Sequence, residues 1–235
     1  MAIELRPPLH SVVVSILENG AMVKRAYPTY RWADLARFMT QAFGENKVDY
    51  SSLGIVGHSG EDYSVARGNK VYAAHEGIVS HVQDDVSFGT GVEIVNRALH
   101  FKTVYWHFML GSVRVELGEA VDANTVLGQV DNTGFSFGDH LHFGFKVVDE
   151  NGATLNADNG YRGALDPTPY KVDFIPMFIT EADLDLLYRL AFLRAPDAEA
   201  NFHVGHSLRQ VLLDMLDSGE FNERVDALNL LRPKI

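Results

Sequence analysis

Two histidines separated by a single residue, His140 and His142, are well suited to carry chemistry in this chain. In an extended strand, residues i and i+2 point to the same side, with their side chains ~7 Å apart. That spacing allows one imidazole to bind a metal ion while the other faces a substrate. A glycine-containing loop, residues 133–139, precedes the pair, and a strand-like run, residues 143–148, follows it. The pair is therefore predicted where a loop enters a sheet, a common position for active-site residues.

A second cluster, His58-Ser59-Gly60-Glu61-Asp62, combines an imidazole with a carboxylate four residues later. Ligand atoms lie ~2 Å from a bound metal, so two ligands of one ion are only ~3–4 Å apart. A straight strand would separate positions 58 and 62 by ~13 Å, and glycine is unfavourable in a regular helix. The spacing therefore predicts a tight bend at Ser59-Gly60 that forms a metal-binding pair. The alternative is a surface loop whose polar groups contact only water.

The third candidate is His107, in the run Tyr105-Trp106-His107-Phe108. Strand alternation predicts Tyr105 and His107 on one face and Trp106 and Phe108 on the other. A half-buried strand histidine held by a neighbouring group is the alternative interpretation. Of the ten histidines, the six outside these clusters are expected at structural or surface positions, with an approach of His75 to the site as the alternative.

Composition limits the classes of function. The net charge of −11 argues against nucleic-acid binding, because phosphates require a basic patch. The absence of cysteine excludes disulfides and thiolate metal sites, so a transition-metal site must use His, Asp and Glu. No stretch approaches the ~20 apolar residues of a membrane span. The N-terminal residues do not have the pattern of a secretory signal.

The chain divides into three predicted parts. Residues 1–39 are expected to form an N-terminal extension with a short strand, turns and one helix over residues 32–39. Residues 40–175 contain short β-rich runs separated by glycine, which indicate a mainly β domain built on an antiparallel sheet, sandwich or barrel. These runs are residues 70–74, 77–82, 92–95, 103–108, 125–130 and the strand at His140. Residues 176–235 have helical apolar spacing and predict a small α-helical module.

Together these motifs resemble the lysostaphin/LytM-type zinc endopeptidases of bacterial peptidoglycan, over roughly residues 40–170. The motifs appear in the order and spacing of that family. They are Gln41-Ala42-Phe43-Gly44-Glu45, His58-x-Gly60-x-Asp62, residues 67–79, Tyr105-Trp106-His107, residues 115–121 and 127–130, Asn132-Thr133-Gly134 and His140-Leu141-His142-Phe143.

The resemblance implies a role for each of the five candidate residues. His58, Asp62 and His142 would bind Zn²⁺, and a water would occupy the fourth position, which catalytic zinc leaves open. His107 and His140 would flank the ion. One would take a proton from the attacking water, and the other would support the oxyanion or protonate the departing amine. The family implies His107 as the base.

Three departures from the family pattern stand close to these residues. Asp139 replaces a common Pro, Gly144 replaces a common Glu, and Trp106 replaces a smaller residue. An acid at position 139 could raise the pKa of an adjacent histidine. All five chemical positions are retained, which argues against the metal-free regulatory members of the family.

The sequence thus predicts a zinc metalloendopeptidase that cleaves peptide cross-links or stem peptides of peptidoglycan. It would act at the bacterial cell wall, delivered by a phage or exported by another route. A catalytically inactive wall-binding or structural module is the first alternative. A phosphocarrier-like domain is the second, but it leaves His58 and Asp62 unexplained. The C-terminal helices also resemble a small module appended to bacterial surface proteins, and they are expected to dock on the catalytic domain or on a partner.

Overall fold

The computed structural model describes residues 2–87 and 89–173. Chain contacts divide the protein into two compact units, Met1–Phe174 and Ile175–Ile235, and all the described residues belong to the first. The predicted helical module at 176–235 lies outside the described residues, and the three-part division of the chain stays a prediction. Among the described residues, no helix has the length and apolar character needed to cross a membrane.

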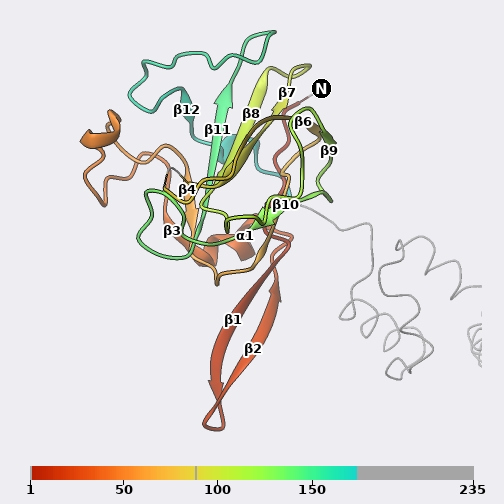
Figure 1. The fold of residues 1–235 in the computed structure, drawn as a ribbon, viewed down its shortest axis with the longest axis vertical. Coiled ribbons are helices and arrows are strands. Elements are labelled where there is room, and N and C mark those ends of the chain that lie inside the picture. The colour runs from red at the N-terminus through yellow and green to blue at the C-terminus, as the bar shows by residue number, and fades with distance from the viewer. Residues whose placement is uncertain (1, 88, 174–235) are drawn as a thin grey trace, which may run out of the picture. The chain divides into compact units, whose positions relative to one another are not determined.

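The described residues form a main antiparallel sheet of eight strands, drawn in Figure 1. Its order is β3-β4-β11-β8-β7-β6-β9, and β12 pairs with β11 beyond the path. The strands are β3 (Met39–Gln41), β4 (Glu61–Tyr63), β6 (Gly77–Gln83), β7 (Gly91–Asn96), β8 (Phe101–Trp106), β9 (Ala120–Val121), β11 (Leu141–Val147) and β12 (Ala164–Leu165). A small second sheet pairs β5 (Lys70–Tyr72) with β10 (Val126–Gln129). The predicted mainly β, antiparallel fold is confirmed.

The predicted β-rich runs coincide with β5, β6, β7, β8, β10 and β11. The predicted helix at 32–39 is shorter, because α1 (Trp32–Leu35) continues as a 3₁₀ turn, η1 (Ala36–Phe38). Met39 then begins β3, where it pairs with Tyr63. The helix therefore cannot extend to residue 39, because Met39 pairs in the sheet. Two further 3₁₀ turns are η2 (Ser51–Leu53) and η3 (Thr168–Tyr170).

The N-terminal region contains a hairpin that the sequence interpretation reduced to one short strand. Strands β1 (Ser11–Glu18) and β2 (Ala21–Pro28) pair in register from end to end, and the hairpin extends away from the main sheet in Figure 1. Its two-residue turn has φ values of 50° at Asn19 and 81° at Gly20. Two positive φ angles are the requirement of a type I′ turn, and Asn-Gly is its commonest sequence. The dipeptide Asn19-Gly20 is visible in the sequence, and it is the local pattern that predicts this hairpin.

The first 39 residues also contribute to the hydrophobic core. Leu5, Leu9 and Leu35 are fully buried and belong to the same apolar cluster as Phe143 of β11. Trp32 lies against the Phe143 ring, at 5.8 Å between centroids, and its indole N–H donates to the Leu5 carbonyl. The N-terminal segment therefore packs on the sheet as part of its core.

His75 is buried in this core and takes no part in the cleft described below. Its Nδ1 lies 2.7 Å from the Glu76 carbonyl, and its Nε2 lies 2.8 Å from Thr103 Oγ1. The Thr103 hydroxyl in turn lies 2.8 Å from the Tyr105 hydroxyl. Burial lowers the pKa of His75 from 6.5 to about 4. The folded protein therefore holds this ring in its neutral form.

This buried histidine predicts a loss of stability in mild acid. Between pH 6.5 and pH 4 the unfolded chain protonates His75 and the folded chain does not, so the stabilisation is complete above pH 6.5 and is lost as the pH falls. The 2.5-unit difference corresponds to at most about 3 kcal/mol of unfolding free energy. Urea unfolding from pH 7 to pH 4.5 should show a shallower pH dependence in His75→Gln than in the wild type.

His81→Gln is the matched control, because His81 is exposed on β6. It should keep the wild-type pH dependence. An unchanged slope in His75→Gln would show that His75 is not the group that titrates.

Candidate active site

Strand register places two of the candidate residues, Asp62 and His142, in one row across the main sheet. Asp62 of β4 pairs with Gln41 of β3 on one side and with His142 of β11 on the other. His142 then pairs with Trp106 of β8, which pairs with Gly91 of β7. Directly opposed residues in antiparallel strands project from the same face. The side chains of Gln41, Asp62, His142 and Trp106 accordingly line one cleft.

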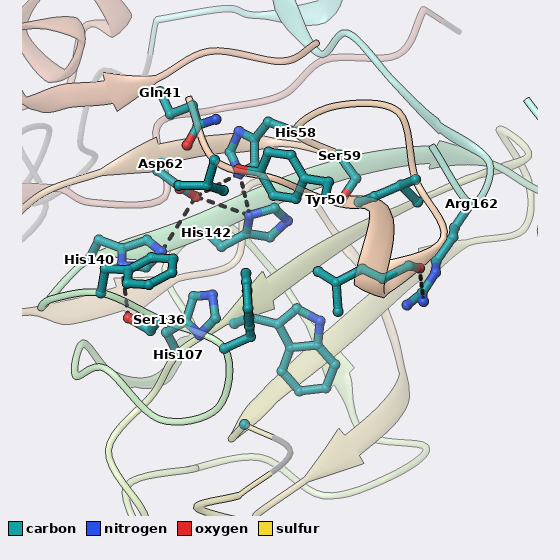
Figure 2. Close-up of a pocket in the computed structure, with 17 residues that line it drawn as sticks. Gln41, Tyr50, His58, Ser59, Asp62, His107, Ser136, His140, His142 and Arg162 are labelled. Carbon is teal, nitrogen blue, oxygen red and sulfur yellow. Dashed lines mark hydrogen bonds and ion pairs between the residues drawn. The ribbon is translucent and has the colours of Figure 1, made fainter. Parts of the chain in front are cut away.

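His58, Asp62 and His142 bring three ligand atoms together at the centre of this cleft (Figure 2). Asp62 Oδ1 lies 3.0 Å from His58 Nε2 and 3.0 Å from His142 Nδ1. The two ring nitrogens are also 3.0 Å apart. These separations are close to the ~3–4 Å expected between ligands of one metal ion. The structure therefore brings together the three residues that the sequence predicted as metal ligands.

The bend before β4 lets His58 meet Asp62, as the spacing predicted. Gly60 is needed here for space, because a Cβ atom at this position would lie 2.6 Å from the Phe143 carbonyl oxygen. It would also lie 2.8 Å from Cε1 and Nε2 of the His142 ring. A residue without a side chain therefore allows the bend to pack directly against the His142 imidazole.

The donor chemistry of the three residues suits a cation. His58 Nδ1 lies 3.2 Å from the Ala42 carbonyl oxygen, which can only accept, so the proton of a neutral His58 ring is on Nδ1. His58 Nε2 then presents a lone pair to the Asp62 carboxylate, and this contact of two acceptors favours a cation beside them. A metal-binding histidine usually donates a hydrogen bond from its other ring nitrogen to a carbonyl or carboxylate oxygen, as His58 does to Ala42.

The charge states of the other two residues agree with this arrangement. Burial by itself raises the pKa of Asp62, but the contacts with His142 and His58 lower it by more, so the pKa lies well below its usual range. Asp62 is therefore an anion at neutral pH. Burial lowers the pKa of His142, which favours the neutral ring that metal binding requires.

Glu61 and Asp62 are adjacent acids with opposite orientations, as expected for neighbours in a strand. Glu61 is buried away from the cleft, where Tyr63 donates to it at 2.6 Å and Lys171 Nζ lies 2.7 Å away. Its charge is therefore neutralised within the protein. Of the two acids, Asp62 alone lines the cleft.

His107 and His140 lie beside the triad, with ring centroids 4.4 Å apart. His107 Nδ1 lies 2.7 Å from the Thr133 carbonyl, and His140 Nδ1 lies 2.8 Å from the Gly138 carbonyl. Carbonyls only accept, so each neutral ring has its proton on Nδ1 and a lone pair on Nε2. Both rings thus have Nε2 available for a proton.

The two histidines differ in their surroundings. Burial lowers the pKa of His107 to about 3, and the neighbouring rings of His140 and His142 add to the effect. His107 is therefore neutral near pH 7. His140 Nε2 lies 3.5 Å from Asp62 Oδ1, and its Nδ1 also lies 3.3 Å from the Ser136 hydroxyl. An effect of Asp139 on a neighbouring ring stays a prediction.

Strand alternation gave the wrong orientation for His107. β8 ends at Trp106, and His107 has a left-handed backbone with φ of 70°. That conformation is uncommon for residues other than glycine. As a result Trp106 and His107 both line the cleft, while Tyr105 is fully buried on the opposite side of the sheet. Residues with strained backbone conformations are often found at functional sites.

The cleft has a volume of about 250 Å³ and contains residues that the sequence interpretation did not select. Tyr50 stacks at 5.9 Å from the His58 ring, and Arg162 lies beyond Ser59 (Figure 2). Phe135 and Phe137 are 47% and 80% exposed. Two exposed phenylalanines in a glycine-bounded loop were a readable sign of a binding surface, whereas Tyr50 and Arg162 reach the cleft only through the tertiary fold.

Residues 56–157 match the family model described as Peptidase family M23. The predicted resemblance to the lysostaphin/LytM-type family is therefore confirmed.

The chain is also similar to particular proteins at low identity. An "Uncharacterized metalloprotease" from Haemophilus influenzae is 27% identical over 139 residues, which cover 59% of this chain and 28% of that protein. The chain thus spans less than a third of that relative. The lysostaphin catalytic domain from Staphylococcus simulans is 24% identical, with a TM-score of 0.46, over 58% of this chain and 93% of that one. The prophage-encoded M23 protein EnpA from Enterococcus faecalis is 27% identical, with a TM-score of 0.41, over 51% and 88%.

Because Gly60 packs against the His142 ring, a methyl group added at position 60 should disturb that ring. Gly60→Ala should displace the ring and weaken metal binding by about 10- to 100-fold, the usual cost of disturbing the support of a metal ligand. Competition with a chromophoric chelator measures this affinity. Ser59→Ala, in the same bend, adds no atom against His142 and should bind the metal ion like the wild type. Equal affinity in Gly60→Ala would mean that the ring does not need this space.

Proposed function

We propose that this protein is a zinc-dependent endopeptidase that hydrolyses peptide cross-links or stem peptides of bacterial peptidoglycan. The observation that carries the proposal is the meeting of five side chains in one cleft. His58, Asp62 and His142 converge on one point, and His107 and His140 lie beside them with Nε2 unprotonated in their neutral forms. The family match of residues 56–157 supports peptide hydrolysis.

Zn²⁺ is the metal that best suits two imidazoles and one carboxylate. Mg²⁺ and Ca²⁺ prefer oxygen ligands, whereas Zn²⁺ binds nitrogen and oxygen in a small tetrahedral site. When bound by His58, Asp62 and His142, the ion would supply a water with a pKa near ~7 and would polarise the substrate carbonyl. Three protein ligands leave a fourth position for that water.

His107 is the residue we assign as the general base. Its ring is neutral near pH 7 because burial lowers its pKa to about 3, and the Thr133 carbonyl holds its proton on Nδ1. Nε2 can therefore accept a proton from the attacking water. His140 would serve the other side of the reaction. A proton on its Nε2 would lie next to Asp62 Oδ1, and from there His140 could support the oxyanion or protonate the departing amine.

The cleft also suits an extended peptide. Aromatic side chains line it together with the triad, including Tyr50, Trp106 and Phe135. Activity on peptidoglycan would place the protein at the bacterial cell wall, reached by phage delivery or by another export route.

Loss of a metal ligand should abolish both zinc binding and hydrolysis. In His142→Ala, we expect the zinc content to fall from one ion per chain to none. Release of new amino termini from purified cell wall should fall below about one thousandth of the wild-type rate, because the metal supplies the nucleophile. His81→Ala is the control and should retain both. A wild-type protein that binds zinc but releases no termini would instead support the inactive wall-binding module.

Loss of the base should separate catalysis from metal binding. His107→Ala keeps the three ligands, so zinc content should be unchanged, while kcat should fall by about 10²- to 10⁴-fold, the usual contribution of a general base. Metal analysis and wall hydrolysis on the same preparation test this. Full activity in His107→Ala would assign the base to another group, and His140 would be the next residue to replace.

A further inference from the structure

One charged side chain in the cleft is not explained by the proposed chemistry. Among the described residues that line the cleft, Asp62 and Arg162 carry permanent charges. Asp62 belongs to the metal triad, so Arg162 is left without a role. Figure 2 shows Arg162 beyond Ser59, at the opposite end of the cleft from His107 and His140. An arginine side chain stays protonated in proteins, so Arg162 is unsuited to proton transfer, but it can hold another part of a substrate.

The loop that carries Arg162 is fixed by its own hydrogen bonds. Asn159 Oδ1 accepts the backbone N–H groups of Tyr161 and Gly163, each at 2.9 Å. Asn159 Nδ2 donates to the Ala164 carbonyl at 2.9 Å, at the start of β12. Arg162 itself has φ of 54°, which is uncommon for this residue type and persists only where the surroundings impose it.

A second set of contacts fastens this loop to the other wall of the cleft. The Val56 N–H donates to the Gly160 carbonyl at 2.9 Å, and the Tyr161 ring packs on Phe43 at 4.8 Å between centroids. Arg162 Nη2 donates to the Leu53 carbonyl. The loop is therefore fixed, and the bond to Leu53 restricts the exposed guanidinium before any ligand binds, which reduces the entropy that binding would cost.

The guanidinium has donors to spare. Arginine carries five N–H donors in a planar fork, and the Leu53 carbonyl engages one nitrogen. The fork matches a carboxylate, which it can bind through two parallel hydrogen bonds. The cleft beside it is lined by Tyr50, Leu53 and Ile55, and Arg162 itself is exposed, so a ligand can reach the guanidinium directly from solvent.

Nearby charges also favour an anion at this end of the site. Lys146 of β11 stands opposite Ala164 of β12 and opposite Lys102 of β8. Lys102 is paired with Glu93 at 2.7 Å, so Arg162 and Lys146 leave a local surplus of positive charge. Burial lowers the pKa of Lys146, Glu93 opposes this effect, and the charges of Lys102 and Arg162 add to it. Such a positive region is notable in a chain with a net charge of −11.

We infer that Arg162 forms a carboxylate-binding subsite that recognises a free carboxylate of the substrate peptide, at a residue removed from the bond that is cleaved. This inference rests on the proposed function, because it takes the ligand to be a peptide in the hydrolytic cleft. The preferred substrate class is then a stem peptide with free carboxylates. A cross-bridge of uncharged residues such as glycine offers Arg162 no partner.

Two matched ligands test the subsite. One is a wall stem peptide with free carboxylates, and the other is the same peptide with its carboxylates converted to amides. Binding is measured by calorimetry in the full-length His107→Ala protein, in which turnover is slow. We expect the carboxylate form to bind about tenfold more tightly, as charge-assisted hydrogen bonds do.

Replacement of the arginine should remove this preference. Arg162→Gln keeps a donor for the Leu53 carbonyl but no charge, and its ratio of the two affinities should be near one. Arg162→Lys should keep part of the preference. Arg37→Gln removes an exposed arginine outside the cleft and should leave the ratio unchanged. If Arg162→Gln does not fold, Arg162→Asn tolerates the positive φ better and replaces it.

Equal affinity for the two peptides in the parent protein would overturn the inference, as would an unchanged ratio in the neutral Arg162 variant. Wall hydrolysis by the wild type, measured in parallel, separates the two proposals. Hydrolysis with a ratio of one contradicts the subsite alone. A tenfold preference that Arg162 controls, without hydrolysis of wall, contradicts the proposed function and leaves the subsite standing.

Discussion

The antiparallel pairing of β4, β11 and β8 is the constraint on which the site depends. It sets Asp62 opposite His142 and His142 opposite Trp106. Because side chains alternate between faces, a slip of one residue in β11 would direct His142 into the core and Leu141 into the cleft. The buried residues on the far side, Leu141 and Phe143, oppose such a slip. Hydrophobic burial on one face of the sheet therefore fixes the geometry of the polar face.

Backbone carbonyls provide a second layer of control. Ala42, Thr133 and Gly138 each place a carbonyl oxygen against the Nδ1 atom of a cleft histidine, namely His58, His107 and His140. Each contact fixes the proton on the outer nitrogen and leaves Nε2 for a metal ion or a proton. The three carbonyls come from loops, so the loops determine the protonation pattern of side chains that the sheet positions.

The site also concentrates features that cost stability. His107 has a left-handed backbone, which costs on the order of 1–3 kcal/mol for such a residue. His142, whose pKa is lowered by burial, lies 3.0 Å from the anionic Asp62, a combination that stabilises the fold poorly but suits the binding of a cation. The loop at Arg162 repeats the pattern, with a second left-handed residue held by Asn159 and the Leu53 carbonyl. Strain at both ends of the cleft coincides with the groups that would contact substrate.

The sequence alone determined the fold class and most strands of the main sheet, and it selected the five histidine and aspartate residues that the structure brings into one cleft. It could do so because β-rich runs and the spacings in His58-x-Gly60-x-Asp62 and His140-Leu141-His142 are local properties of the chain. The orientation of His107 was not readable, because it depends on a single left-handed residue after β8. The place of Arg162 was not readable either, since a loop more than 100 residues away from Leu53 brings it into the cleft. Local spacing thus identified which residues meet in the cleft, and long-range packing decided which way they face and which residues lie beside them.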